Sequence, residues 1–110
     1  MKVLIIDDDP TSRECLSELL RSRGHEPAEA ASAGEGLPML LYCDAAIVDG
    51  LGGACWVVLE PCKEHGIPAV LFSGHRELVR AALAEGTPAV LKPNYNDLLA
   101  AIGQAAGVGR

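Results

Sequence analysis

The sequence has 110 residues, and its nine Lys and Arg against fifteen Asp and Glu give a formal net charge of −6 at pH 7. Hydrophobic residues make up 49% of the chain and charged residues 22%, a composition that excludes a disordered segment and is typical of one globular domain. The acidic balance argues against direct nucleic-acid binding, and the apolar runs are far shorter than the ~18 residues that a membrane span needs. We therefore expect a soluble, cytoplasmic domain without membrane contact, in which the four cysteines stay reduced.

Short β-rich runs alternate with amphipathic stretches along the whole chain. The predicted strands are Lys2–Asp7, Glu26–Ala31, Ala45–Asp49, Ile67–Phe72 and Pro88–Lys92. The predicted helices are Pro10–Arg23, Ala33–Tyr42, Ala54–His65, Arg76–Glu85 and Asn94–Ala106. This alternation indicates βαβ units and a parallel sheet, which we expect in one α/β domain over residues 1–106, followed by a tail at 107–110.

Capping and breaking residues set the expected helix boundaries. Asp9 is suited to cap the first helix, with Pro10 at its first position and Gly24 after its end. Pro38 lies within the second helical pattern, so that helix should be short or begin near it. Pro61 should kink or divide the third helix, because it removes a hydrogen bond from the helix interior.

Polar residues follow four of the five predicted strands. They are the doublet Asp7-Asp8, then Asp49, Ser73 and Lys92. In an open parallel sheet the functional site lies beyond the carboxyl ends of the strands, so these side chains should converge. Two carboxylates ~4 Å apart repel by about 4 kcal/mol at an effective dielectric of 20, so either a positive charge joins them or one of them keeps a proton. Each residue alone could serve a turn or a helix cap, but their combination indicates a Mg²⁺ site that holds a phosphoryl group or accepts one on a carboxylate.

Over nearly its whole length, the sequence resembles the receiver domains of two-component response regulators. The residues that carry the resemblance are Asp7-Asp8 in VLIIDD, Asp49 in DAAIVD, Ser73 in AVLFSG and Lys92-Pro93 in AVLKP. The resemblance implies a flavodoxin-like (βα)5 fold, with a doubly wound, parallel, five-stranded sheet in the strand order 2-1-3-4-5. It also implies a cis peptide bond between Lys92 and Pro93.

The resemblance further implies a signalling function rather than conventional enzyme activity. Asp49 would accept a phosphoryl group from a histidine kinase or a phosphotransfer protein, while Ser73 and Lys92 would contact phosphoryl oxygens. The phosphorylated domain would then act through a downstream effector protein. Catalysis would be limited to self-phosphorylation from phosphohistidine or small phosphodonors and to slow autodephosphorylation.

The same resemblance implies a set of Mg²⁺ ligands. Asp8, Asp49 and the backbone carbonyl of Leu51 would bind the ion directly, and Asp7 would act through a bound water. The apolar Leu51 side chain should help to exclude attacking water and so favour a longer-lived phosphoryl group.

The sequence departs from the family pattern in two places. The segment 50–56, which follows Asp49, is glycine-rich and shorter than usual, and only 19 positions separate Ser73 from Lys92, so the fourth helix should be short. Ala89 stands where the family often has an aromatic residue that moves on phosphorylation. Any signal should therefore pass through backbone and loop movement.

Two other functions are compatible with parts of the sequence. The departures above would also suit a pseudo-receiver, which is an interaction module that works without phosphorylation. The residues from Asp7 to Thr11 match the D-x-D-x-T signature of haloacid-dehalogenase-like phosphatases, with Asp7 as nucleophile and Asp9 as acid/base. That hypothesis leaves Asp49 without a role, and no acidic pair follows Lys92.

Overall fold

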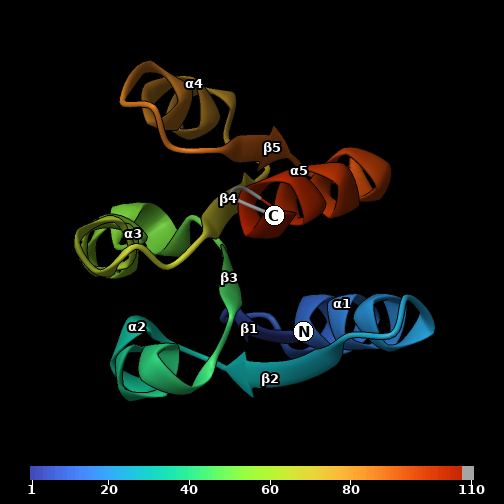
Figure 1. Cartoon of the computed structure of the whole chain (residues 1–110). Coiled ribbons are helices and arrows are strands. Elements are labelled where there is room, and N and C mark those ends of the chain that lie inside the picture. The colour runs from blue at the N-terminus through green and yellow to red at the C-terminus, as the bar shows by residue number, and fades with distance from the viewer. Residues whose placement is uncertain (108–110) are drawn as a thin grey trace.

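Five parallel strands form one sheet in the computed structural model, which describes residues 1–107 (Figure 1). The strands are β1 (Lys2–Ile6), β2 (Glu26–Ala30), β3 (Ala45–Val48), β4 (Ala69–Ser73) and β5 (Ala89–Leu91). Their order across the sheet is β2-β1-β3-β4-β5, as predicted. Ile6 pairs with Val48, and Ser73 pairs with Leu91, so strands that are distant in sequence end side by side at one edge.

Helices cover both faces of the sheet (Figure 1). They are α1 (Pro10–Ser22), α2 (Ala33–Gly36), the 3₁₀ helices η1 (Leu37–Tyr42) and η2 (Leu51–Gly53), α3 (Trp56–His65), α4 (Arg76–Ala84) and α5 (Tyr95–Gly107). On one face, α1 and α5 contribute core residues such as Leu16 and Ile102. On the other, η1, α3 and α4 contribute residues such as Leu40, Val58 and Ala82. This three-layer arrangement is the predicted doubly wound α/β fold.

The interior strand β1 shows why an apolar run without alternation predicts a strand of this sheet. Val3 and Ile5 belong to the core beneath α1 and α5, whereas Leu4 and Ile6 belong to the core on the opposite face. All four side chains are fully buried, because successive residues of a strand point to opposite faces and both faces are covered.

Several predicted boundaries are corrected by the structure. The second predicted helix is a single α-helical turn followed by the 3₁₀ helix η1, because Pro38 cannot continue an α-helical hydrogen-bond ladder. By contrast, α3 runs undivided through Pro61, and its buried face holds it to the core. Strand β4 begins at Ala69, two residues later than predicted, since Pro68 has no N–H to donate to the sheet.

The glycine-rich segment after β3 also differs from the prediction. It forms the short helix η2, so α3 begins at Trp56 and not at Ala54. At the other end of the chain, α5 extends to Gly107, and the rest of the predicted tail lies outside the described residues. None of the helices within residues 1–107 combines the length and the apolar character that a membrane crossing requires.

Candidate functional site

Neighbouring strand ends bring three carboxylates together. Asp7 directly follows β1, and its N–H donates to the carbonyl of Ala30 at 3.1 Å. Asp49 directly follows β3, and its N–H donates to the carbonyl of Ile6 at 2.8 Å. One carboxylate oxygen from each of Asp7, Asp8 and Asp49 lies within 4.8 Å of the others. Asp7 is buried, Asp49 is half-buried and Asp8 is exposed, so the cluster opens to solvent on the Asp8 side.

Lys92 places a positive charge between two of these carboxylates. Its Nζ donates to Asp49 Oδ1 at 2.6 Å and to Asp7 Oδ2 at 3.0 Å. Its backbone N–H donates to the carbonyl of Ser73 at 2.9 Å, which ties it to the end of β4, and its peptide bond to Pro93 is cis as expected. Burial alone would lower the pKa of Lys92, but the hydrogen bonds and charges of Asp49 and Asp7 outweigh burial and raise it. The ammonium is therefore fully charged at neutral pH.

Asp49 also shapes the loop that follows it. Its second oxygen, Oδ2, accepts the N–H of Leu51 at 3.1 Å. Leu51 has a positive φ of 51°, which is uncommon for a residue other than glycine. The Leu51 carbonyl, the expected metal ligand, accepts the N–H of Ala54 at 3.1 Å within the η2 turn. A carbonyl oxygen has two lone pairs, so this hydrogen bond leaves one for a cation.

Ser73 closes the site on the β4 side. It is 1% exposed, and its Oγ accepts the N–H of His75 at 3.1 Å, which leaves the hydroxyl hydrogen for another acceptor. Gly50 makes this close packing possible, since a Cβ at that position would lie 3.0 Å from Ser73 Oγ and 2.8 Å from Cδ2 of Leu78. The His75 side chain is exposed at the start of α4.

The environment of Asp7 does not suit the nucleophile of a phosphatase. Its side chain is only 3% exposed, and its two oxygens accept the N–H of Asp9 at 2.9 Å and the Lys92 ammonium. Asp9 caps α1, where its carboxylate accepts hydrogen bonds from Thr11 and Ser12. The hydrogen bond from Ser12, followed by that from Thr11, lowers the pKa of Asp9 and so opposes a role as a general acid.

Charge and donor type show that the cluster fits a divalent cation. Three carboxylates carry three negative charges, and Lys92 neutralises one of them. Mg²⁺ prefers oxygen ligands and binds through a few carboxylates while keeping several waters. Asp7, Asp8 and Asp49 are the one group within residues 1–107 whose acidic, His or Cys side chains lie close enough together to hold a metal ion.

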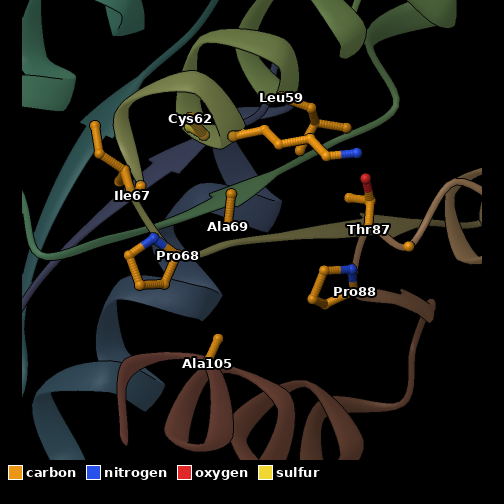
Figure 2. A pocket seen from close by; sticks show the side chains of 11 residues that line it. Leu59, Cys62, Ile67, Pro68, Ala69, Thr87, Pro88 and Ala105 are labelled. Atoms are coloured by element: carbon orange, nitrogen blue, oxygen red, sulfur yellow. The ribbon is translucent and has the colours of Figure 1, made fainter. Parts of the chain in front are cut away.

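A separate groove of about 270 Å³ lies at the opposite, amino-terminal edge of the sheet (Figure 2). Its lining is mostly apolar and includes Leu59, Cys62, Ile67, Pro68, Pro88 and Ala105. Burial raises the pKa of the Cys62 thiol to about 11, so this sulfur is protonated at neutral pH and is a poor nucleophile. The chemistry of the molecule is thus concentrated at the carboxyl-terminal edge.

The structure also reveals contributors that the sequence patterns did not indicate. Arg13 donates to the Asp7 carbonyl at 2.6 Å and pairs with Glu29 at 3.4 Å, which fixes the backbone at the end of β1. The Lys92 ammonium lies 5.8 Å from the centroid of the Phe72 ring, and that ring contacts Tyr95. In the sequence, the contact of Arg13 with Asp7 was indicated only by the position of Arg13, one turn into the helix that follows Asp7-Asp8.

The strand order and the polar edge together define a flavodoxin-like α/β domain with a charged site at the carboxyl ends of its strands. No protein-family model matches the sequence, and no curated protein matches it either. Solved structures do match. A response regulator receiver domain from Clostridium thermocellum is 28% identical with a TM-score of 0.80, over 96% of this chain and 94% of that one. A CheY-like receiver domain protein from Methanospirillum hungatei is 26% identical with a TM-score of 0.79, over 96% and 93%.

A third solved structure is a complex with a phosphoryl mimic. It is a response regulator protein from Thermotoga maritima in complex with Mg²⁺-BeF, with 24% identity and a TM-score of 0.80, over 94% of this chain and 97% of that one. At that identity it supports the fold alone. The first two structures, both above 25% identity and covered over nearly their whole length, support the resemblance of this chain to response regulator receiver domains.

Proposed function

We propose that this domain accepts a phosphoryl group on Asp49 from the phosphohistidine of a histidine kinase or a phosphotransfer protein, and that a downstream effector protein reads the modified state. We place this exchange in the cytoplasm. The observation that carries the proposal is the Lys92 ammonium, which lies 2.6 Å from Asp49 and 3.0 Å from Asp7 within the three-carboxylate cluster. Of the two carboxylates that Lys92 binds, Asp49 is the more accessible, with 16% of its side chain exposed against 3% for Asp7.

The transfer exchanges one bond to phosphorus for another. An Asp49 oxygen attacks the phosphorus, and the P–N bond to the donor imidazole breaks. The electron pair of that bond stays on the departing nitrogen, and the donor leaves as neutral imidazole when its other nitrogen carries a proton. Lys92 follows the transferred group by exchanging its contact with Asp49 for one with a phosphoryl oxygen, and the Ser73 hydroxyl donates to another.

The carboxylate cluster prepares the site for a dianionic group. Asp8, Asp49 and the Leu51 carbonyl would hold Mg²⁺ directly, with Asp7 bound through a water. A bound Mg²⁺ would offset the charge of the carboxylates and of the incoming phosphoryl oxygens. The Leu51 side chain, two residues after the acceptor, would restrict the approach of water to the acyl phosphate.

Acetyl phosphate labelling tests the proposal. We expect intact mass spectrometry to detect one added phosphoryl group on the wild type in the presence of Mg²⁺, and none on Asp49→Asn. Asp97→Asn, which alters an exposed carboxylate on α5, is the matched control and should be labelled like the wild type.

The other functions predict different results. The short, glycine-rich segment after Asp49 and the presence of Ala89 favour the pseudo-receiver as the second candidate. An unlabelled wild type would support that module and refute the proposal. Hydrolysis of p-nitrophenyl phosphate that persists in Asp49→Asn but is lost in Asp7→Asn would instead support the phosphatase.

A further inference from the structure

One aromatic ring lies beside the ammonium group of Lys92, and a second ring packs against the first. Phe72 immediately precedes Ser73 at the end of β4 and is 1% exposed. Its ring centroid is 5.8 Å from Lys92 Nζ. The Tyr95 ring lies 5.4 Å from the Phe72 ring, with an angle of 57° between the ring planes. The charged group and the two rings therefore form one contact chain from the acceptor site to the start of α5.

Tyr95 lies on the open side of this chain. It is 36% exposed, whereas the Phe72 ring that it contacts is buried. Tyr95 is the first residue of α5. Its N–H donates to the carbonyl of Pro93 at 2.7 Å, and Pro93 directly follows Lys92. The backbone of Tyr95 is therefore held by the same short turn that carries the lysine.

The lysine needs such support because its stem is long and flexible. An ammonium group is attracted to the face of an aromatic ring within about 6 Å of the centroid, and a tilted ring pair adds a further favourable contact. A Phe72 ring held in one orientation limits the positions that the ammonium can take. When Lys92 moves from Asp49 to a phosphoryl oxygen, this restriction keeps its charge close to the transferred group.

We propose that Tyr95 is a positioning residue for Lys92, acting through Phe72 to hold the ammonium where it binds the phosphoryl group. This inference rests on the proposed function. It predicts a specific separation of effects: loss of the Tyr95 ring should weaken the binding of a phosphoryl mimic, but it should not weaken the binding of Mg²⁺ alone, because Lys92 is no ligand of the cation.

Calorimetric titrations of the full chain measure the two affinities. Mg²⁺ is titrated first, and beryllofluoride is then titrated at saturating Mg²⁺. We expect Tyr95→Ala to bind beryllofluoride about three- to tenfold more weakly than the wild type, with Mg²⁺ affinity unchanged. Tyr95→Phe keeps the ring and should restore wild-type binding. Tyr42→Ala removes an exposed tyrosine from η1 and is the matched control.

Each result decides a different statement. Wild-type beryllofluoride affinity in Tyr95→Ala would overturn the positioning role. A parallel loss of Mg²⁺ and beryllofluoride affinity would also overturn it, since it would indicate general damage to the site. If Tyr95→Ala does not fold, Tyr95→Leu keeps apolar packing without the aromatic ring and should show the same selective loss. A wild type that binds no beryllofluoride would instead refute the proposed function itself.

Discussion

Replacement of Lys92 by methionine should reveal how far the carboxylate cluster lowers the free energy of unfolding when its positive charge is removed. Lys92→Met keeps a long apolar stem but removes both ion pairs, to Asp49 at 2.6 Å and to Asp7 at 3.0 Å. Asp7 is the group most affected, because its side chain is 3% exposed and keeps only the N–H of Asp9 as a donor to its carboxylate. Water can reach Asp49 more easily, since its side chain is 16% exposed.

The expected loss follows from these exposures. A hydrogen bond to a charged group contributes about 1.5–3 kcal/mol, and a buried group left without its partner retains its full desolvation cost. Because hydration compensates part of the loss at Asp49, we expect Lys92→Met to lower the free energy of unfolding by about 2–3 kcal/mol in EDTA. For a domain of this size, that corresponds to a decrease in Tm of roughly 8–12 °C.

Mg²⁺ should reverse most of this loss. A ligand that binds only the folded state at a hundred times its Kd adds about 2.7 kcal/mol to stability. The variant site carries three negative charges and no ammonium, so its affinity for the cation should exceed that of the wild type.

Thermal and urea unfolding in EDTA and in excess Mg²⁺ measure these differences. Lys63→Met is the matched control, because the Lys63 ammonium is exposed and donates only to the carbonyl of Glu85 at 3.3 Å. It should unfold like the wild type under both conditions. Wild-type stability of Lys92→Met in EDTA, or a loss that Mg²⁺ leaves unchanged, would refute the electrostatic account of the cluster.

Two further predictions concern pH and packing. The pKa of Lys92 is raised above 10.5, so the stabilising contribution of its charge is complete below pH 10.5 and is lost as the pH rises through the folded-state pKa. The difference in unfolding free energy between wild type and Lys92→Met, measured in urea, should therefore shrink as the pH rises above 10.5. The ionisation of Cys62 affects both proteins equally and cancels in this difference. Gly36→Ala should lose about 1–3 kcal/mol in urea unfolding, because a Cβ there would lie 2.8 Å from Cγ1 of the fully buried Ile6. Gly34→Ala, whose added Cβ would meet only Ser32 Oγ at 3.9 Å, is its control and should not be destabilised.

The fold could be predicted from the sequence because its signals agree at several levels. The run Val3–Ile6 is apolar at every position, which a strand buried on both faces requires, and the structure buries all four side chains. Boundaries were wrong where local backbone chemistry decides the outcome. The segment around Pro38 became a 3₁₀ helix, and residues 51–53 formed η2, because short helical turns leave no periodic pattern of their own.

The convergence of the acidic residues with Lys92 could be predicted for a topological reason. Parallel strands end at one edge of a sheet, so residues that follow different strands must lie near one another. The contacts of Arg13 with Asp7 and of Tyr95 with Phe72 could not be predicted in this way. They depend on the direction of side chains that reach between elements, and sequence spacing does not specify that direction.

The loop after Asp49 connects the proposed chemistry to a change that a partner could read. Asp49 Oδ2 accepts the N–H of Leu51, and Leu51 holds a positive φ of 51° at the start of η2. Under the proposed function, phosphorylation turns the carboxylate into a mixed anhydride and removes its negative charge. A hydrogen bond to a charged acceptor is roughly twice as strong as one to a neutral acceptor, so the modification weakens the contact that holds η2. With Ala89 on β5 in place of an aromatic residue, this loop would be the route by which phosphorylation of Asp49 changes the surface under the proposed function.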